Sequence, residues 1–267
     1  MKKHFYLLKT CLCALAVGVL AGCSAEGDDL QLADGMGAVK LSITADTGFD
    51  TMTKAITEAD YTNLANYTVQ ILDGNNRVVE GCEWAGNALP GEDELIELDN
   101  GNYTLLAFTG EDYKGIGATT EGMYVEGKKA FNINGASTSV SAVCTPQCAR
   151  MTVAFDAKMA DHFNNYYVVF TGTTALGEGN YIWEKDFTDP VYMAITGTET
   201  ITATINLVDK NSKVGNPIVK TYKMTAAQAQ KMNIAPVVNG GSVGISIEID
   251  DSTNDIPVDI EIPSEWL

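Results

Sequence analysis

Thr200 to Val208 reads Thr-Ile-Thr-Ala-Thr-Ile-Asn-Leu-Val, and apolar and polar residues alternate along it. This alternation puts the apolar side chains on one face of a β-strand, and it is typical of a strand buried on that face only. Period-two patterns of this kind dominate the chain from Ala38 onward, and no long segment shows sustained helical periodicity. The sequence therefore predicts an all-β protein.

Further strands are predicted from the same alternation or from short apolar runs. Before Pro146 they are 39–43, 67–71, 78–79, 103–108, 129–133 and 137–143, and after it they are 151–155, 166–170, 217–222 and 242–249. The turn residues Asp73-Gly74-Asn75-Asn76 predict a hairpin. Strand 103–108 is apolar on both faces, which predicts burial on both. Two short helices are predicted, over 157–163 and 225–231.

The spacing of the strands predicts two tandem β-sandwich domains. The boundary falls near Cys144 to Arg150, where a proline interrupts two strands, so the domains are residues 38–146 and 147–250. Residues 251–267 are predicted to be an acidic linker and a C-terminal edge strand. Pairing of this strand within its own sheet is favoured over donation to a partner molecule.

The first residues have the features of an export signal. Lysines flank the start, and the apolar stretch 11–21 is too short to span a bilayer. The stretch ends in Leu20-Ala21-Gly22-Cys23, which resembles a bacterial lipobox. That resemblance implies cleavage after residue 22 and acylation of Cys23 by diacylglycerol and a further chain such as palmitate. An ordinary signal peptide with a chance cysteine is the alternative. Residues 23–37 are predicted to form a flexible acidic tether.

The net charge of the chain limits the kinds of partner that it can bind. The chain has 35 acidic against 17 basic residues, a formal net charge of −18, which argues against nucleic acid. The acidic run after Cys23 resembles the surface-export signal of Bacteroidota lipoproteins. It favours exposure at the cell surface, on the outer membrane, over a position facing the periplasm.

No residue pattern singles out a catalytic centre. The chain has two histidines, and only His162 lies outside the leader, beside Asp161 in a predicted helix. Residues 250–255 are acidic but lack the spacing of a calcium-binding loop. We therefore predict no enzyme activity, no cofactor and no metal site.

Three cysteines remain outside the leader and lipobox, Cys82, Cys144 and Cys148. Export permits disulfides, and either Cys144–Cys148 or Cys82–Cys148 could form, but an odd number leaves at least one thiol free. Structural or unpaired cysteines are favoured over a zinc site or a catalytic cysteine.

Two further groups of residues are candidates for surface function. The aromatic residues Tyr113, Tyr124, Tyr181 and Trp183 lie at predicted loops or strand edges and could contact sugar or protein, although the favoured interpretation is that each covers a sandwich edge. Thr51 and Ser252 each follow an aspartate in tripeptides that resemble the O-glycosylation sequence of Bacteroides-type bacteria.

Residues 98–110, Leu-Asp-Asn-Gly-Asn-Tyr-Thr-Leu-Leu-Ala-Phe-Thr-Gly, resemble a strand motif of Bacteroidota surface lipoproteins. Segments 124–127, 131–133, 140–144 and 151–155 resemble the rest of that pattern. The chain looks like a Bacteroides-type lipoprotein family of unknown function, similar to fimbrillin-type pilins and their accessory subunits. The resemblance, over roughly residues 36 to 249, implies tandem immunoglobulin-like or transthyretin-like sandwiches behind a lipobox.

The chain departs from fimbrillins at one feature. The resemblance implies maturation by cleavage after an arginine in the first strand, but the only arginines are Arg77 and Arg150, and Lys54 is the nearest early basic residue. We therefore expect an anchoring or accessory role in adhesion or fimbria-like assembly, with fimbrial subunits, a surface protein or a glycan as partner. A glycan-binding lipoprotein beside a polysaccharide transporter is the alternative, and a hydrolase or lyase is less favoured.

Overall fold

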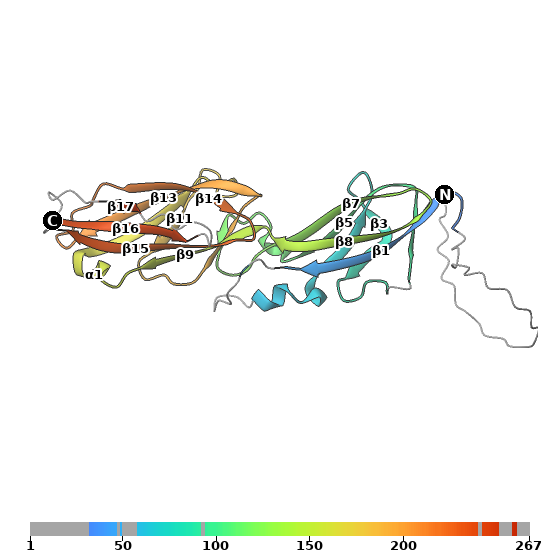
Figure 1. The fold of residues 1–267 in the computed structure, drawn as a ribbon, viewed down its shortest axis with the longest axis horizontal. Coiled ribbons are helices and arrows are strands. Elements are labelled where there is room, and N and C mark those ends of the chain that lie inside the picture. Colours follow the sequence, from blue (N-terminus) through green and yellow to red (C-terminus); the bar gives the residue numbers. More distant parts are fainter. Residues whose placement is uncertain are drawn as a thin grey trace, which may run out of the picture. The chain divides into compact units, whose positions relative to one another are not determined.

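The structure is a computed structural model, and it describes residues 32–46, 49, 58–91, 94–239, 242–250 and 258–260. These residues form seventeen strands, three 3-10 helices and one α-helix, α1 (Met159–His162). The strands assemble into three sheets (Figure 1). The prediction of an all-β sandwich fold is thus confirmed. We call residues 32–146 the N-terminal half and residues 148–260 the C-terminal half.

The N-terminal half holds one sheet of seven strands in the order β3-β2-β5-β7-β8-β1-β4. Their bounds are β1 Met36–Ala45, β2 Thr68–Leu72, β3 Val78–Ala85, β4 Ile96–Asp99, β5 Gly101–Thr109, β7 Val125–Ile133 and β8 Ser137–Pro146. Strands β7 and β8 pair at two positions only, Val125 with Pro146 and Glu126 with Thr145. This short link lets the sheet fold over into two layers. The 3-10 helices η1 (Glu58–Tyr61), η2 (Leu64–Asn66) and η3 (Glu111–Tyr113) lie in its connections.

The first core fills the space between these layers. It takes Val39 and Ile43 from β1, Val69 and Ile71 from β2, and Leu105 from β5, all buried. The alternation of β1, β2 and β5 explains this, because every second side chain points to the same face. The hairpin expected at 73–76 joins β2 to β3.

The C-terminal half holds two sheets that enclose the second core. One has the order β11-β10-β13-β14, and the other the order β17-β16-β15-β9-β12-β6. Bounds are β6 Ala118–Thr119, β9 Cys148–Phe155, β10 Phe163–Thr171, β11 Tyr181–Glu184, β12 Val191–Ala194, β13 Thr198–Asp209, β14 Ile218–Thr225, β15 Ala229–Asn239, β16 Ser242–Asp250 and β17 Val258–Ile260. The second core is formed by buried residues of both sheets, among them Phe170, Trp183 and Ile245.

One strand crosses between the halves. β6 belongs by sequence to the N-terminal half, yet it pairs antiparallel with β12 at Ala118–Met193 and Thr119–Tyr192. The two halves therefore share a sheet.

The C-terminal strand β17 lies at the edge of the same six-stranded sheet. It pairs antiparallel with β16, Ile245 opposite Ile260 and Ile247 opposite Val258. This is the pairing within its own sheet that the sequence favours.

Two local expectations are wrong. Residues 225–231 form no helix: Ala226 to Gln228 make a turn, with Ala227 at φ 62°, and β15 begins at Ala229. Strand β5 buries only one face fully, since Leu106 and Phe108 are half-buried. The predicted first helix is confirmed in its short core, α1.

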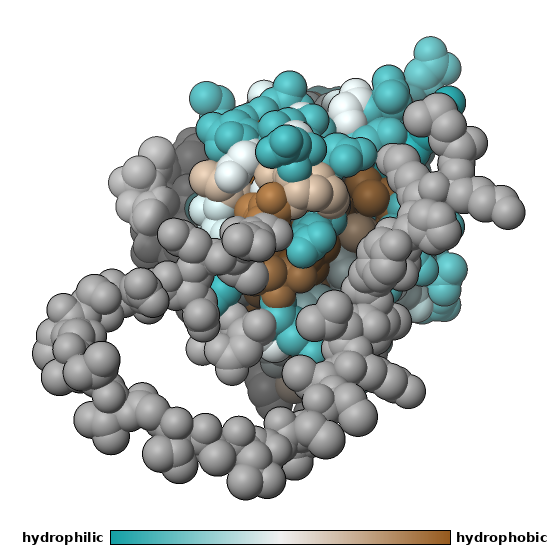
Figure 2. All heavy atoms as spheres, turned by 90° about the vertical axis from the view of Figure 1, so that its right-hand side faces the viewer, coloured by the Kyte–Doolittle hydropathy of each residue, from teal (hydrophilic) through white to brown (hydrophobic). Residues whose placement is uncertain are grey.

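Apolar side chains are exposed at several places among the described residues. Figure 2 looks onto the right-hand side of Figure 1 and shows a hydrophobic area in the middle of that face, surrounded by hydrophilic residues. Among the described residues, the large apolar side chains that stand exposed are Val78, Ile116, Val143, Ile182, Val214, Val219 and Val238.

Candidate functional site

The four predicted binding aromatics do not form one surface. Trp183 is fully buried in the second core, where its Nε1 donates a hydrogen bond to the Phe187 carbonyl at 3.0 Å. In β11 the side chains alternate, so Ile182 and Glu184 point outward and Trp183 points inward. The interpretation of Trp183 as an exposed aromatic is therefore wrong. Tyr181 is half-buried and packs against the same core.

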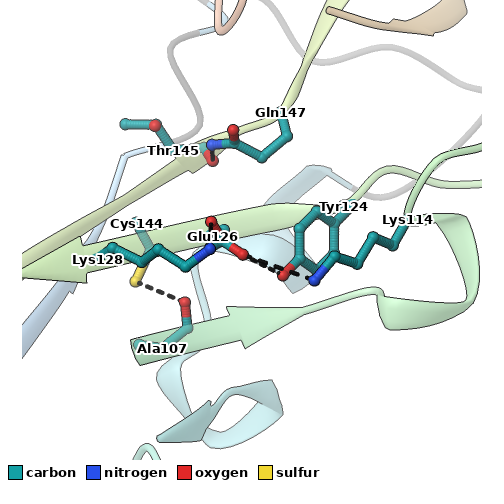
Figure 3. Close-up of polar contacts among 8 residues, drawn as sticks. All are labelled: Ala107, Lys114, Tyr124, Glu126, Lys128, Cys144, Thr145 and Gln147. Atoms are coloured by element: carbon teal, nitrogen blue, oxygen red, sulfur yellow. Dashed lines mark hydrogen bonds and ion pairs between the residues drawn. The ribbon is translucent and has the colours of Figure 1, made fainter. Parts of the chain in front are cut away.

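Tyr124 is also buried, at 7% exposure, and it belongs to a small polar cluster (Figure 3). Its hydroxyl donates a hydrogen bond to Glu126 Oε2 at 2.6 Å, and Lys128 Nζ lies 2.8 Å from Glu126 Oε1. Lys114 Nζ lies 3.9 Å from the same carboxylate and 4.9 Å from the centre of the Tyr124 ring. The phenol and two ammonium groups thus converge on one carboxylate.

This cluster shifts the acidity of its members. Burial raises the pKa of Tyr124, and the hydrogen bond to the Glu126 carboxylate raises it further. Burial also acts to raise the pKa of Glu126, but the hydrogen bonds from Lys128 and Tyr124 and the charges of Lys128 and Lys114 outweigh it, so this pKa is lowered. Glu126 is therefore a stable anion held in place, and Tyr124 is its donor.

Tyr113 lies close to Tyr124 at a small cavity of about 30 Å³. The cavity is also lined by Met123, Cys148 and Tyr192, which come from both halves of the chain. A Cβ on Gly122 would meet the Tyr113 ring at 2.2 Å, so glycine is needed for this close contact. Tyr113 and Tyr124, two of the four predicted aromatics, thus lie close together. They pack against other parts of the protein and do not form an exposed binding surface.

A buried ion pair joins the two halves beside that cavity. Arg150 Nη1 donates hydrogen bonds to both carboxylate oxygens of Glu58, at 3.0 and 3.1 Å. The hydroxyl of Tyr192 donates to Glu58 Oε1 at 2.7 Å. Each side chain is nearly inaccessible to solvent. Glu58 comes from η1, Arg150 from β9 and Tyr192 from β12, so three distant segments meet.

An aromatic ring packs on this ion pair. The Arg150 guanidinium carbon lies 4.9 Å from the centre of the Phe49 ring, and Phe49 packs at 6.0 Å against Tyr192. We call Phe49, Glu58, Arg150 and Tyr192 the junction cluster. Sequence reasoning missed it, because its charged members are 92 residues apart and no local pattern links them.

The three cysteines of the described part of the chain are all free and buried, so none of the disulfides considered forms. Burial raises the pKa of each thiol; together with the negative charges of Glu126 and Glu58 it raises the pKa of Cys144 to about 11 and that of Cys148 to about 12. Cys144 is held in the first core, its Sγ 3.9 Å from the Ala107 carbonyl oxygen (Figure 3). A protonated, buried thiol is a poor nucleophile and a poor metal ligand.

The other polar candidates of the described residues are dispersed. His162 is half-buried at the end of α1, with its ring 6.4 Å from that of Phe163. No group of three or more His, Cys, Asp or Glu side chains within the described ranges could hold a metal ion. None of the helices in that part of the chain is long and apolar enough to cross a membrane.

One surface depression stands apart from the junction cluster. It has a volume of about 310 Å³ and lies at the edge strand β3 and η2, lined by Ala65, Asn66, Tyr67, Thr68, Glu83, Trp84 and Ala85. Glu83 is fixed there by a hydrogen bond from Gln70 Nε2 to its Oε2, at 2.6 Å. The depression is thus lined by an amide, a carboxylate and the exposed part of Trp84, whose remainder packs against the first core.

Several predicted residues lie outside the described part of the chain. They are the lipobox and acylation residues Leu20, Ala21, Gly22 and Cys23, the glycosylation candidates Thr51 and Ser252, and Lys54. Both arginines are described: Arg150 is in the junction cluster, and Arg77 lies in the turn before β3. Neither lies in the first strand.

Comparison with known proteins gives one family and a group of similar folds. The model of the family described as DUF4493, a domain of unknown function, matches residues 35–264. No curated protein matches the chain.

Among solved structures, the chain is similar to the fimbrial anchor protein Mfa2 from Porphyromonas gingivalis, at 10% identity, covering 81% of this chain and 98% of that one, with a TM-score of 0.42. It is similar to an adhesin candidate from Bacteroides ovatus, at 11% identity, covering 84% and 95%, with a TM-score of 0.47. It is also similar to a fimbrial assembly protein from Parabacteroides distasonis, at 12% identity, covering 84% and 98%, with a TM-score of 0.37.

Proposed function

The chain belongs to the DUF4493 family, a domain of unknown function, and we propose that it is a cell-surface lipoprotein with a non-catalytic role in adhesion or fimbria-like assembly. Its partners are the outer membrane, through acylated Cys23, and a fimbrial subunit, a surface protein or a glycan. The proposal also keeps two sandwich domains, 38–146 and 147–250, behind a leader and tether.

The observation that carries this proposal is the way the two halves are joined. β6 completes the sheet of the C-terminal half, and the junction cluster places a buried ion pair between η1 and β9. A pair of β-modules held together in this way can act as one rigid spacer. An adhesin needs such a spacer, because it must present one end to a partner while the other end stays at the membrane.

The chemistry of the buried groups supports a non-catalytic role. The three described thiols are protonated and enclosed, and Glu58 is bound by Arg150 and Tyr192. A general base or nucleophile has to be accessible to substrate, and its pKa has to suit proton transfer at the working pH. The thiols meet neither condition and Glu58 is inaccessible to a substrate, so we assign these groups to stability.

The anchor is tested by metabolic labelling with a palmitate analogue in a Bacteroidota host, followed by protease treatment of intact cells. We expect a labelled protein that is cleaved on intact cells, and a Cys23→Ala variant that carries no label and leaves the membrane fraction. Label on the variant, or protection of the wild type from protease, would contradict the proposal.

Mass analysis of the purified native protein tests glycosylation at Thr51 and Ser252.

The adhesion role is tested with beads that carry the protein in one orientation. We expect the beads to bind cells or purified fimbrial subunits and beads with heat-unfolded protein to lose that binding. Equal binding by both would remove the argument for a specific partner.

The depression at β3 favours glycan binding as a second candidate function. Asn66 and Glu83 offer polar groups there, and the half-buried Trp84, which packs against the first core, adds only its exposed part. Isothermal titration against polysaccharide fragments tests this candidate, with Glu83→Gln and Trp84→Phe as variants. If both variants bind the fragments with the same heat as the parent protein, the glycan does not bind at this depression.

A further inference from the structure

The first strand of the N-terminal half is held along its length by a parallel neighbour. β1 pairs with β8 at eight consecutive positions, from Ala38–Ser137 to Ala45–Cys144. Backbone hydrogen bonds mark both ends of this ladder, from Ala38 N to Ala136 O at 3.4 Å and from Asp46 N to Cys144 O at 2.9 Å. The two strands run side by side in Figure 1.

The start of β1 is held on its other edge as well. β4 pairs antiparallel with it from Met36–Asp99 to Val39–Ile96, and Asn100 N donates to Gly35 O at 2.8 Å. The strand is packed closely here, since a Cβ on Gly37 would come within 2.6 Å of Ile133 Cγ2. The point where the chain enters the N-terminal half is therefore fixed from both sides.

The chain leaves the N-terminal half at the opposite end of the same strand pair. β8 ends at Pro146, and β9 of the C-terminal half begins two residues later, at Cys148. The residue between them is held on both sides, since Gln147 N donates to Tyr124 O at 2.8 Å and Ile195 N donates to Gln147 O at 3.2 Å. The exit is thus also held by backbone hydrogen bonds on both sides.

Entry and exit decide how a pulling force acts on this pair. Tension between residues before β1 and residues after β8 pulls β1 toward its own N-terminus and β8 toward its own C-terminus. Because the strands are parallel, these forces are opposed along the strand axis, so the strands are loaded in shear. All ladder hydrogen bonds then resist together, whereas pulling the strands apart from one end breaks them one after another.

We propose that the N-terminal half is a tension-bearing element and that the β1–β8 pair is its mechanical clamp. This inference rests on the proposed function, with the anchor before β1, and it takes the adhesive partner to bind the C-terminal half, beyond β8. A force-loaded tether is governed by its unfolding rate and not by its equilibrium stability. A shear-loaded pair at the entry lowers that rate in the direction in which the anchor pulls.

Force spectroscopy on single molecules tests the clamp with two attachment geometries. The chain from residue 24 contains every described element, and its residues 32–267 form one compact unit. One handle is placed at its N-terminus. The second is placed on a cysteine introduced either at Lys158, which follows β9, or at Asn134, in the turn before β8. Both positions are exposed, and the buried native thiols have raised pKa values and react slowly.

The two geometries load the same strands differently. With Lys158→Cys the pair is sheared, and with Asn134→Cys β1 is peeled from β8, starting at Ala38. We expect a several-fold higher force for the first opening of the N-terminal half in the sheared molecule. Equal forces in the two geometries would overturn the proposal.

Variants at Ser42 test whether the ladder itself bears the force. Ser42 is exposed and lies in the middle of β1. Its N–H has the same direction as those of Ala38 and Asp46, because the direction repeats every second residue. Ser42→Pro removes this donor, and we expect it to lower the shear force toward the peeling force, while Ser42→Ala keeps the force of the parent. An unchanged force in Ser42→Pro, with the fold retained by circular dichroism, would overturn the clamp.

The outcomes separate this inference from the proposed function. Loss of the force difference with Cys23 still acylated and exposed would remove the clamp alone. A protein without acylation at Cys23 could still show the force difference, and the proposed function would then fail on its own test.

Discussion

Both halves of the molecule begin with a strand that pairs in parallel with a later one, and they differ in the path that the chain takes after this pair. In the N-terminal half, β1 pairs with β8, and the chain then leaves the half. In the C-terminal half, β9 pairs with β15 over six positions, from Ala229–Arg150 to Ile234–Phe155, but β15 turns back into β16. The same parallel pair thus lies between entry and exit in one half and inside the sheet in the other.

The two hydrophobic cores also differ in the residues that they bury. The second core is built from large apolar side chains, among them Phe170, Trp183 and Met193, whereas the first also holds the three thiols and reaches Tyr192 of the junction cluster. The two halves thus bury side chains of different chemistry. We expect the C-terminal half to depend mainly on apolar burial, and the N-terminal half on strand pairing and on its contact with the C-terminal half.

The largest effect is expected from Trp183→Ala. It removes a fully buried indole from the second core and should cost about 4 kcal/mol of unfolding free energy. Hydrogen exchange, followed by mass spectrometry in denaturant, should show the C-terminal half opening first. The matched control is Trp84→Ala at the half-buried edge of the first core, where the loss should be clearly smaller. Equal losses of unfolding free energy in the two variants would contradict the expected difference between the halves.

Removal of one charge from the junction cluster is expected to cost nearly as much. Arg150→Met leaves the Glu58 carboxylate buried without its charged partner, which should cost about 3 kcal/mol. Urea unfolding monitored by circular dichroism measures the loss. The double variant Glu58→Gln with Arg150→Met should recover most of it, because no charge is then left buried. A double variant as unstable as the single one would show that the ion pair is not what joins the halves.

Tyr192→Phe is a smaller change in the same cluster. It removes the hydroxyl that donates to Glu58 Oε1 and should cost about 1.5 kcal/mol, as loss of a hydrogen bond to a charged acceptor does. The same urea experiment measures it, with Tyr181→Phe as the control outside the cluster. A loss as small as that of the control would mean that Glu58 is satisfied by Arg150 alone.

The smallest effect concerns Glu126 and pH. Its pKa is lowered in the folded state, so the stability that its charge provides is present above the ordinary value of 4.5 and is lost as the pH falls through the folded value. Glu126→Gln should remove this part of the pH dependence and cost less than about 1 kcal/mol at pH 7, because both lysine partners are half exposed. Melting temperatures at pH 7 and pH 3.5 measure it. An unaltered pH dependence in the variant would assign the acid sensitivity to other carboxylates.

Local patterns were enough to predict the strands but not the environment of individual aromatics. The alternation of residues 200–208 predicts β13, because side-chain period and burial are linked within one strand. Trp183 was misjudged, although Ile182 and Glu184 on either side already indicate that it faces the other way. Residues 225–231 contain good helix formers, yet the pairing of β15 with β9 and β16 prevailed over that local preference.

The junction cluster could not be predicted for a different reason. Glu58, Arg150 and Tyr192 are far apart in the chain, and each by itself looks like an ordinary surface residue. Only the sheet pairings bring them together, so the signal lies in the tertiary structure. The buried thiols illustrate the same limit, since sequence spacing allowed disulfides that the strand positions do not form.

The short strand β6 has a consequence for how the chain folds. The outer edge of β12 in the C-terminal half is covered by two residues that the ribosome delivers with the N-terminal half. During synthesis, β6 therefore emerges from the ribosome before its partner β12. The C-terminal half then docks onto an N-terminal half that was made earlier. A C-terminal half expressed by itself would leave that edge of β12 open, and an open edge invites pairing with another copy.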